Sequence, residues 1–311
     1  RGDAGYDHSL HNSVSGVLKQ LISNKTDAEI TNTDTVTSTN ADGFVLGADT
    51  AGPNANSNNQ DTKTYVAWNW KAGGSASSNS DGSITSSVSA NTTAGFSIVS
   101  WTGSGANATV GHGLGVVPKF MIFKSIASSN WGVYHVSLGN TDAVFLNETT
   151  ATGSSSNYWN NTSPTSSVFS LGNGGTNGGS TNNTGGMIAY CFAEKTGYSK
   201  FGSYTGNGNA DGTFIYTGFK PAWLMVKRTD VANHWIILDS KRSTFNLAQN
   251  KLLANESDAE ETGTSNAMDF LSNGFKLKAT NAAANASGGN YIYMAFGQSL
   301  VGSNGVTAKA R

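Results

Sequence analysis

The sequence predicts an all-β protein of tandem antiparallel β-sandwich repeats, jelly-roll or lectin-like in type, with one or two short helices. Two observations carry this prediction: an internal repeat, and a series of short aromatic segments separated by turns rich in Gly and Asn. The composition also allows a hydrophobic core, because 7 Trp, 10 Tyr and 14 Phe accompany a net charge of only −1. A chain of this kind is not a charge-rich disordered polymer.

Charged residues are scarce, at 13% of the chain, against about 25% in typical soluble domains. The 19 basic and 20 acidic residues form no basic run, so we expect neither nucleic acid nor an anionic membrane as a partner. No apolar stretch approaches the ~18 residues of a membrane span. The single cysteine, Cys191, lies in an apolar run and is expected to be a small core residue.

Two long stretches of the chain repeat each other in the same order. The segment WTGSG at 101–105 matches YTGNG at 204–208, and VPKFMIFK at 117–124 matches KPAWLMVK at 220–227. Further on, NWGVY at 130–134 matches HWIIL at 234–238. We therefore predict full β-sandwich repeats at 94–199 and 200–311.

The beginning of the chain resembles only the second half of such a repeat. Asn24 and the motif GFVL at 43–46 match Asn255 and GFKL at 274–277. Residues 1–74 are therefore interpreted as the C-terminal half of a truncated repeat, followed by a Gly/Ser-rich linker at 75–93. Since a half-repeat cannot bury its own hydrophobic face, we expect a preceding segment or a neighbouring copy to supply the rest.

Each copy consists mainly of predicted strands. The segments at 96–101, 120–123, 223–226, 235–238 and 291–294 are rich in aromatic and β-branched residues and bounded by turn residues. Aromatic residues that recur at matching positions, such as Trp131 and Trp235, are expected in the core. Helices are expected only at 13–23 and 243–254, which occupy matching places in their copies.

Four motifs carry a resemblance to a known family: YVAWNWKAGG at 65–74, GFSIVSWTG at 95–103, VGHGLG at 110–115 followed by Pro118, and FKPAWLMVKR at 219–228. The chain resembles the repeat-domain virion structural proteins, tail-fibre-like, of marine tailed bacteriophages. This resemblance implies a non-enzymatic tail fibre or appendage protein on the particle, which contributes to attachment to host-surface glycan. It further implies contacts with other virion proteins. The family offers no catalytic residues to transfer.

The charge-poor surface also favours self-association without like-charge repulsion, so we expect a homo-oligomer, with a trimer as one form. Other functions share these features. One is a capsid decoration or head-fibre protein without a receptor role, and another is a secreted bacterial adhesin. A glycan depolymerase is a further alternative, and it would need a pair of carboxylates, for which Glu260 is a candidate.

One polar loop is a candidate for carbohydrate binding. Tyr158 and Trp159 could stack on a sugar, while Asn157, Asn160 and Asn161 hydrogen-bond its hydroxyl groups. The alternative is that the two rings pack onto the sandwich or between protomers. No cofactor is expected, and the histidine spacing predicts no metal site. A weaker candidate for Ca²⁺ is the alternation of Asn207, Asn209 and Asp211 in a Gly-rich loop, because Ca²⁺ prefers oxygen ligands.

Overall fold

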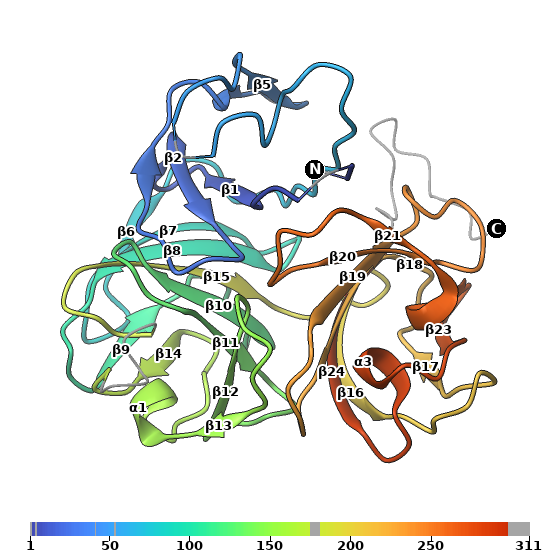
Figure 1. Ribbon diagram of the computed structural model, residues 1–311. Coiled ribbons are helices and arrows are strands. Elements are labelled where there is room, and N and C mark those ends of the chain that lie inside the picture. The colour runs from blue at the N-terminus through green and yellow to red at the C-terminus, as the bar shows by residue number, and fades with distance from the viewer. Residues whose placement is uncertain (1, 4, 41, 53, 175–180, 298–311) are drawn as a thin grey trace.

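The computed structural model describes residues 2–3, 5–40, 42–52, 54–174 and 181–297 (Figure 1). Within these residues all pairs of named strands are antiparallel and both α-helices are short, so the predicted all-β sandwich class is confirmed. None of the described helices is long and apolar enough to cross a membrane. Residues 298–311, which end the predicted repeat at 200–311, lie outside the described part.

The second unit of the chain is a two-layer sandwich. Its main sheet contains β8 (Phe96–Thr102), β10 (Phe120–Ser125), β11 (Trp131–His135), β12 (Asp142–Phe145), β13 (Gly153–Ser154) and β15 (Gly186–Phe192). The order across the unit's own strands is β13-β12-β11-β10-β15-β8. The facing layer contains β9 (Ala108–Gly111) and β14 (Val168–Leu171), and the helix α1 (Ser156–Trp159) precedes β14.

The third unit is built in the same way. Its main sheet contains β16 (Ser199–Thr205), β18 (Pro221–Arg228), β19 (Trp235–Asp239), β20 (Asn250–Leu253), β21 (Glu261–Thr262) and β24 (Asn290–Gly297). The order is β21-β20-β19-β18-β24-β16. The facing layer contains β17 (Phe214–Tyr216), β22 (Met268–Leu271) and β23 (Gly274–Leu277), accompanied by the 3-10 helix η1 (Thr264–Asn266) and by α3 (Ala282–Asn285).

The two full units have the same topology, and their equivalent strands carry the matching sequence motifs. Strand for strand, β8 corresponds to β16, β10 to β18, β11 to β19 and β15 to β24, and the sheets add these strands in the same order. The five predicted strand segments also lie in strands of the structure.

The predicted linker at 75–93 is wrong, because this stretch folds as a hairpin. β6 (Ser77–Asn79) pairs with β7 (Ser86–Asn91), and β7 pairs along β8, which extends the main sheet of the second unit to eight strands. Val88 is buried in the core of that sandwich. The serine-rich stretch is therefore a pair of strands rather than a flexible linker.

The first unit matches the second half of the third. The sheet of β1 (Ser9–Asn12), β2 (Gly16–Ile22) and β3 (Ile30–Thr31) corresponds to β19-β20-β21, and the pair of β4 (Val36–Thr39) and β5 (Phe44–Leu46) corresponds to β22-β23. Residues 65–70, which match β24 in sequence, form no strand. Both strands that flank β24 in the third unit lack a counterpart in the first unit, so residues 65–70 have no ladder to join.

Both predicted helices are wrong. Residues 13–23 contain β2, and residues 243–254 contain the equivalent strand β20. β2 lies between two buried regions: Leu21 faces the core that the three units share, whereas Gln20 faces the interior of the first unit. A strand covered on both faces loses the alternation of apolar and polar residues that would identify it.

The three units surround one shared hydrophobic core (Figure 1). Each full unit also has its own core between its two layers. The shared core takes buried side chains from all three units, such as Leu21, Phe192 and Phe296, and Trp68 and Trp70 pack against it. Consequently the units do not follow each other as separate beads but form one body.

Side-chain hydrogen bonds join the three units in a cycle. Trp131 Nε1 donates to the carbonyl oxygen of Ile22 at 3.1 Å, and Trp235 Nε1 donates to that of Phe145 at 2.8 Å. At the remaining joint, His8 Nε2 lies 2.9 Å from the carbonyl oxygen of Leu253. Strand pairing places the three acceptors at equivalent positions, because within each unit the acceptor lies opposite the residue that follows that unit's own His8, Trp131 or Trp235. The third unit therefore contacts the first just as the first contacts the second.

Three recurring asparagines hold these donors in place. The backbone N–H groups of His8, Trp131 and Trp235 donate to the side-chain oxygens of Asn24, Asn147 and Asn255, at 2.8–2.9 Å. This contact explains why an asparagine recurs at the same position of each copy. The result is a body with pseudo-threefold symmetry, of which the first unit is incomplete.

Candidate functional site

The loop predicted to bind sugar presents no aromatic platform. Tyr158 and Trp159 lie on α1 and are only 3% and 1% exposed, so the stacking prediction is wrong and the alternative, packing onto the sandwich, is confirmed. The Trp159 ring lies 4.9 Å from that of Phe123, and its Nε1 donates to the carbonyl oxygen of Asp142 at 2.9 Å. Polar neighbours in the sequence concealed that this short helix turns both rings inward.

The asparagines of the same loop serve its local structure. Asn157 accompanies the cap of α1, where its backbone N–H donates to Ser155 Oγ. Asn160 and Asn161 are exposed and adopt left-handed backbone angles, φ 50° and 47°, which asparagine tolerates better than most residues. Asn160 Oδ1 accepts a hydrogen bond from Asn107. These residues stay on the surface but do not surround a concave site.

The side chains of the Ca²⁺ candidate loop point to other partners. Asn207 Oδ1 accepts from the backbone N–H of Asn209, and Asn209 Oδ1 accepts from that of Asp211. Asp211 pairs with Lys276 at 2.5 Å, and this contact lowers the pKa of its carboxyl. Among the residues that the structure describes, no group of three His, Cys, Asp or Glu side chains is arranged to hold a metal ion.

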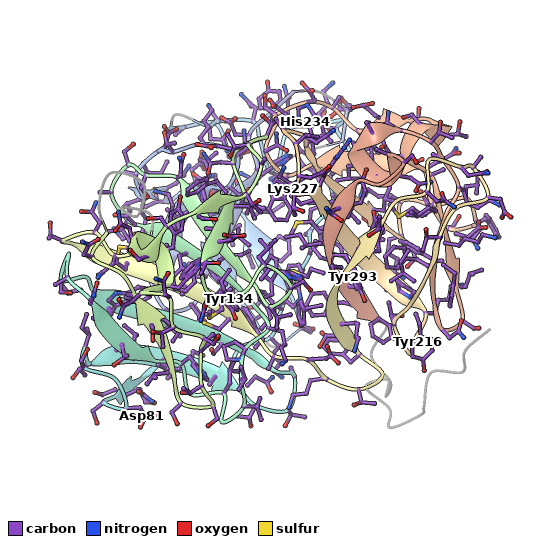
Figure 2. All side chains as sticks on the ribbon, turned by 90° about the horizontal axis from the view of Figure 1, so that it is seen from below. Asp81, Tyr134, Tyr216, Lys227, His234 and Tyr293 are labelled. Atoms are coloured by element: carbon purple, nitrogen blue, oxygen red, sulfur yellow. The ribbon has the colours of Figure 1, made fainter. Side chains whose placement is uncertain are left out.

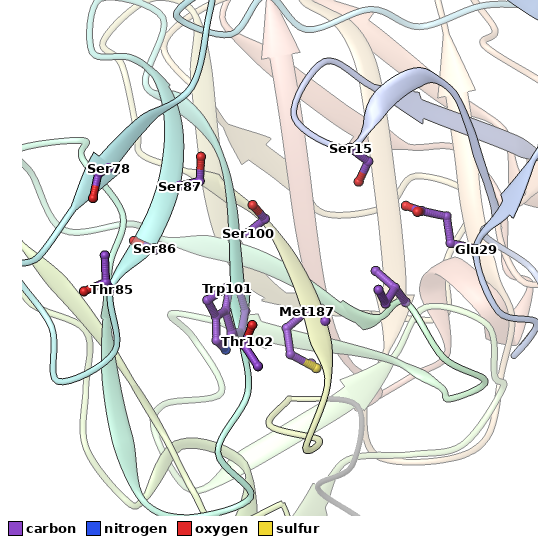
Figure 3. A pocket seen from close by; sticks show the side chains of 12 residues that line it. Ser15, Glu29, Ser78, Thr85, Ser86, Ser87, Ser100, Trp101, Thr102 and Met187 are labelled. Carbon is purple, nitrogen blue, oxygen red and sulfur yellow. The ribbon is translucent and has the colours of Figure 1, made fainter.

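A polar groove lies between the first and second units (Figure 3). Ser78, Ser87 and Ser100 pair directly across β6, β7 and β8, so their side chains lie in one row on one face of the sheet. Ser15 and Glu29 of the first unit form the other wall. The groove has a volume of about 550 Å³, and its remaining lining residues are Thr85, Ser86, Trp101, Thr102, Ile126, Gly186 and Met187.

Glu29 gives this groove its charge. Its backbone N–H donates to the carbonyl oxygen of Ile126 at 2.8 Å, which fixes the residue against the second unit. Its Oε2 is buried and has no hydrogen-bond partner among the described residues. A buried acceptor without a donor is costly, so a ligand hydroxyl or amide there would be stabilised. The groove therefore combines a row of hydroxyl groups with one carboxylate, a set that suits a hydroxyl-rich ligand.

Sequence reasoning missed this groove because its two walls come from separate units. The serines of β6 and β7 fall in the stretch interpreted as a linker, and Ser15 in one interpreted as a helix. The alternation of serine with buried residues in β7, where Ser86 and Val88 face the core and Ser87 does not, was the available signal.

The remaining buried charges hold the fold together. Lys124 Nζ donates to the carbonyl oxygens of Ser125 and Ala127, each at 2.7 Å. The equivalent Lys227 is labelled in Figure 2. Its Nζ donates to the carbonyl oxygens of Thr149, Arg228 and Asn233, of which Thr149 belongs to the preceding unit. Burial lowers the pKa of both lysines to about 8.

Glu260, the depolymerase candidate, is likewise engaged by other side chains. Its Oε2 pairs with Arg242 at 2.7 Å, and its Oε1 accepts from Asn250 at 3.0 Å. Arg242 in turn pairs with Asp239 at 2.6 Å. These contacts connect β19, β20 and the loop before β21.

Comparison with known proteins gives a family but no function. No curated protein and no solved structure matches the chain. One family model, described as a domain of unknown function, DUF7483, matches residues 1–299. The match spans all three units, including the incomplete one. The chain therefore belongs to the DUF7483 family.

Proposed function

We propose that this protein is a non-enzymatic structural protein of a tailed-bacteriophage particle, part of a tail fibre or similar appendage. The observation that carries the proposal is the closed arrangement of three repeat units around one shared core. Such a body resists deformation because each unit is fixed to both neighbours. The motif resemblance to phage tail-fibre-like proteins supports the same function.

Surface composition supports self-association on the particle. With 13% charged residues and a net charge of −1, copies meet with little electrostatic repulsion. We propose that the protein assembles with further copies and with other particle proteins. Light scattering of the purified chain tests the first point, and a monomer at all concentrations up to the millimolar range would contradict it.

Electron microscopy with a gold-labelled antibody tests the location. Purified particles should carry the label on the tail or its fibres. Label confined to the head would instead indicate a capsid decoration protein, and unlabelled particles with the protein found only in the host would contradict a place in the virion.

We further propose that the groove of Ser78, Ser87, Ser100 and Glu29 contacts host-surface glycan. Sugar hydroxyl groups would exchange hydrogen bonds with the serine row, and one would donate to the unpartnered Glu29 Oε2. The test measures binding of the chain to an array of bacterial surface polysaccharides. Glu29→Gln and Ser87→Leu should each weaken binding by about tenfold, whereas Ser203→Leu, at an exposed position of β16, should not. Equal effects of all three variants would contradict the groove as the site.

A further inference from the structure

The first unit has open strand edges on one side. Among the described residues β1 pairs only with β2, whereas the equivalent β19 pairs with both β18 and β20. β5 pairs only with β4, whereas the equivalent β23 lies between β17 and β22. Residues 65–70 pair with no strand, whereas β24 lies between β16 and β18. The strands that would pair with these edges all correspond to one continuous segment of the third unit, residues 199–228.

Apolar side chains next to these edges are exposed where their counterparts are buried. Phe44 is 37% exposed and Leu46 36%, whereas the equivalent Phe275 and Leu277 are fully buried. Tyr65 is also exposed, whereas the equivalent Tyr291 is buried. In the first unit these residues, whose counterparts form part of a core, therefore have no opposite side chains to cover them.

The glycine directly before β5 is consistent with the same missing strand. In β23, a Cβ on Gly274 would lie 2.1 Å from the carbonyl oxygen of Ile215 in β17, so only glycine allows β17 to approach. The equivalent Gly43 would meet nothing within 4 Å. Its backbone has no left-handed angle that would call for glycine. Gly43 therefore leaves room for a strand that approaches as closely as β17 approaches Gly274, whereas the second unit has Val168 at this position.

Three buried polar atoms of the first unit also lack partners. His11 Nε2, Thr35 Oγ1 and Asp49 Oδ1 are buried without a hydrogen-bond partner among the described residues. His11 lies on β1 beside the open edge, and Asp49 follows β5. An occupant of the gap would present apolar side chains to Phe44 and Leu46.

The direction of the occupant follows from one backbone hydrogen bond. Gly2 N donates to the carbonyl oxygen of Thr64 at 2.9 Å. Its counterparts are Thr229 N to Asn290 O in the third unit and Ile126 N to Gly186 O in the second, each also at 2.9 Å. In those units this bond directly follows β18 or β10. Gly2 therefore lies where a strand equivalent to β18 would end.

We propose that the open side of the first unit is a docking surface for one contiguous front half-repeat, with the strand pattern of residues 199–228, joined to the chain at the amino side of Gly2. Its three strands pair with residues 65–70, with β5 and with β1. The docked segment buries Phe44 and Leu46 and completes the sandwich of the first unit. This inference is independent of the function proposed above.

The test is a graft in which a copy of residues 199–228 replaces residue 1, so that the counterpart of Arg228 directly precedes Gly2. Because the first unit is polar beside β1, Leu224 and Val226 are replaced by Thr in the grafted copy of one version and kept in another. Hydrogen–deuterium exchange should slow by about tenfold or more at residues 44–46 and 65–70 in at least one version. A dye that binds exposed apolar surface should lose fluorescence. A graft of shuffled sequence is the control and should change neither signal.

Glycine variants make the result specific. In the chain without the graft, Gly43→Val should leave unfolding unchanged, whereas Gly274→Val should destabilise the protein. In the grafted chain Gly43→Val should abolish the protection of residues 44–46. Exchange that is unchanged by both grafts, while β23 and β24 remain protected, would overturn the proposal. So would protection of residues 44–46 in a dimer of the ungrafted chain, because a second copy would then be the occupant.

Discussion

Two tryptophans on neighbouring strands differ in one hydrogen bond. Trp235 Nε1 donates across the joint to Phe145, whereas Trp223 Nε1 is buried without a partner among the described residues. Both rings are buried, so Trp235→Phe and Trp223→Phe lose similar apolar surface. We expect Trp235→Phe to cost about 1–3 kcal/mol more in free energy of unfolding, since the partly buried Phe145 carbonyl loses its donor. Urea denaturation measures both variants, and equal losses would show that the joint contributes nothing.

Acid should destabilise the protein through a buried histidine. His135 is enclosed between the second and third units, and burial lowers its pKa to about 4 from an ordinary value of 6.5. Above pH 6.5 the ring is neutral in both the folded and the unfolded chain. As the pH falls from 6.5 towards 4, only the unfolded chain binds the proton, so the free energy of unfolding falls by about 3 kcal/mol.

The variant His135→Gln should flatten this dependence between pH 6.5 and 4. Some slope should remain, because burial also lowers the pKa of His8, His11 and His112. Urea midpoints at a series of pH values measure the effect. A variant with the slope of the parent protein would show that His135 is not the group responsible.

At the scale of elements, the β6–β7 hairpin covers the edge of β8, whereas β16 in the third unit is an edge strand among the described elements. Val88 of β7 is buried, so Val88→Ala should lower the free energy of unfolding by about 1–3 kcal/mol. Thr93→Ala, in the exposed turn that follows, should stay within about 0.5 kcal/mol. Chemical denaturation measures the free energy of unfolding of both variants. Similar small losses would show that this stretch contributes no more to stability than a linker does.

Strands with a distinctive composition and clear turn boundaries were predictable even where both faces are buried, whereas β2 was not. The segments at 96–101 and 235–238 combine aromatic and β-branched residues with clear turn boundaries, and they form β8 and β19. β2 has apolar residues at Val17, Leu18, Leu21 and Ile22, a spacing that also fits one face of a helix. Only the arrangement of the units, which buries both faces of β2, explains its conformation.

At the scale of the whole molecule, the shared core makes the units depend on one another. Trp223, Ile237 and Phe296 of the third unit are buried against side chains of the other two. Residues 199–297 produced alone would expose this face. We expect that fragment to bind an apolar-surface dye and to unfold at lower denaturant than the whole chain, which should unfold in one transition. A fragment as stable as the whole chain and without dye binding would show that the units are independent.

The repeat could be predicted from sequence, but the closed arrangement of the three units around one core could not. Matching motifs give the number and order of the units, since they depend on local segments such as 117–124 and 220–227. The shared core depends on which face of each sheet meets the others, and both faces of β10 and β18 are apolar. The groove was hidden for the same reason, because Glu29 and Ser87 meet only when the first and second units are in contact.

The three matching joints also bear on how such a chain could arise. Separate polypeptides of one unit each would meet through the same positions, as a cyclic homotrimer does. Duplication and fusion of their genes would remove the entropic cost of association. After fusion, the residues at the three joints would no longer have to be the same. Position 8 has a histidine where the other two joints use Trp131 and Trp235, a difference that one fused chain permits and identical subunits do not.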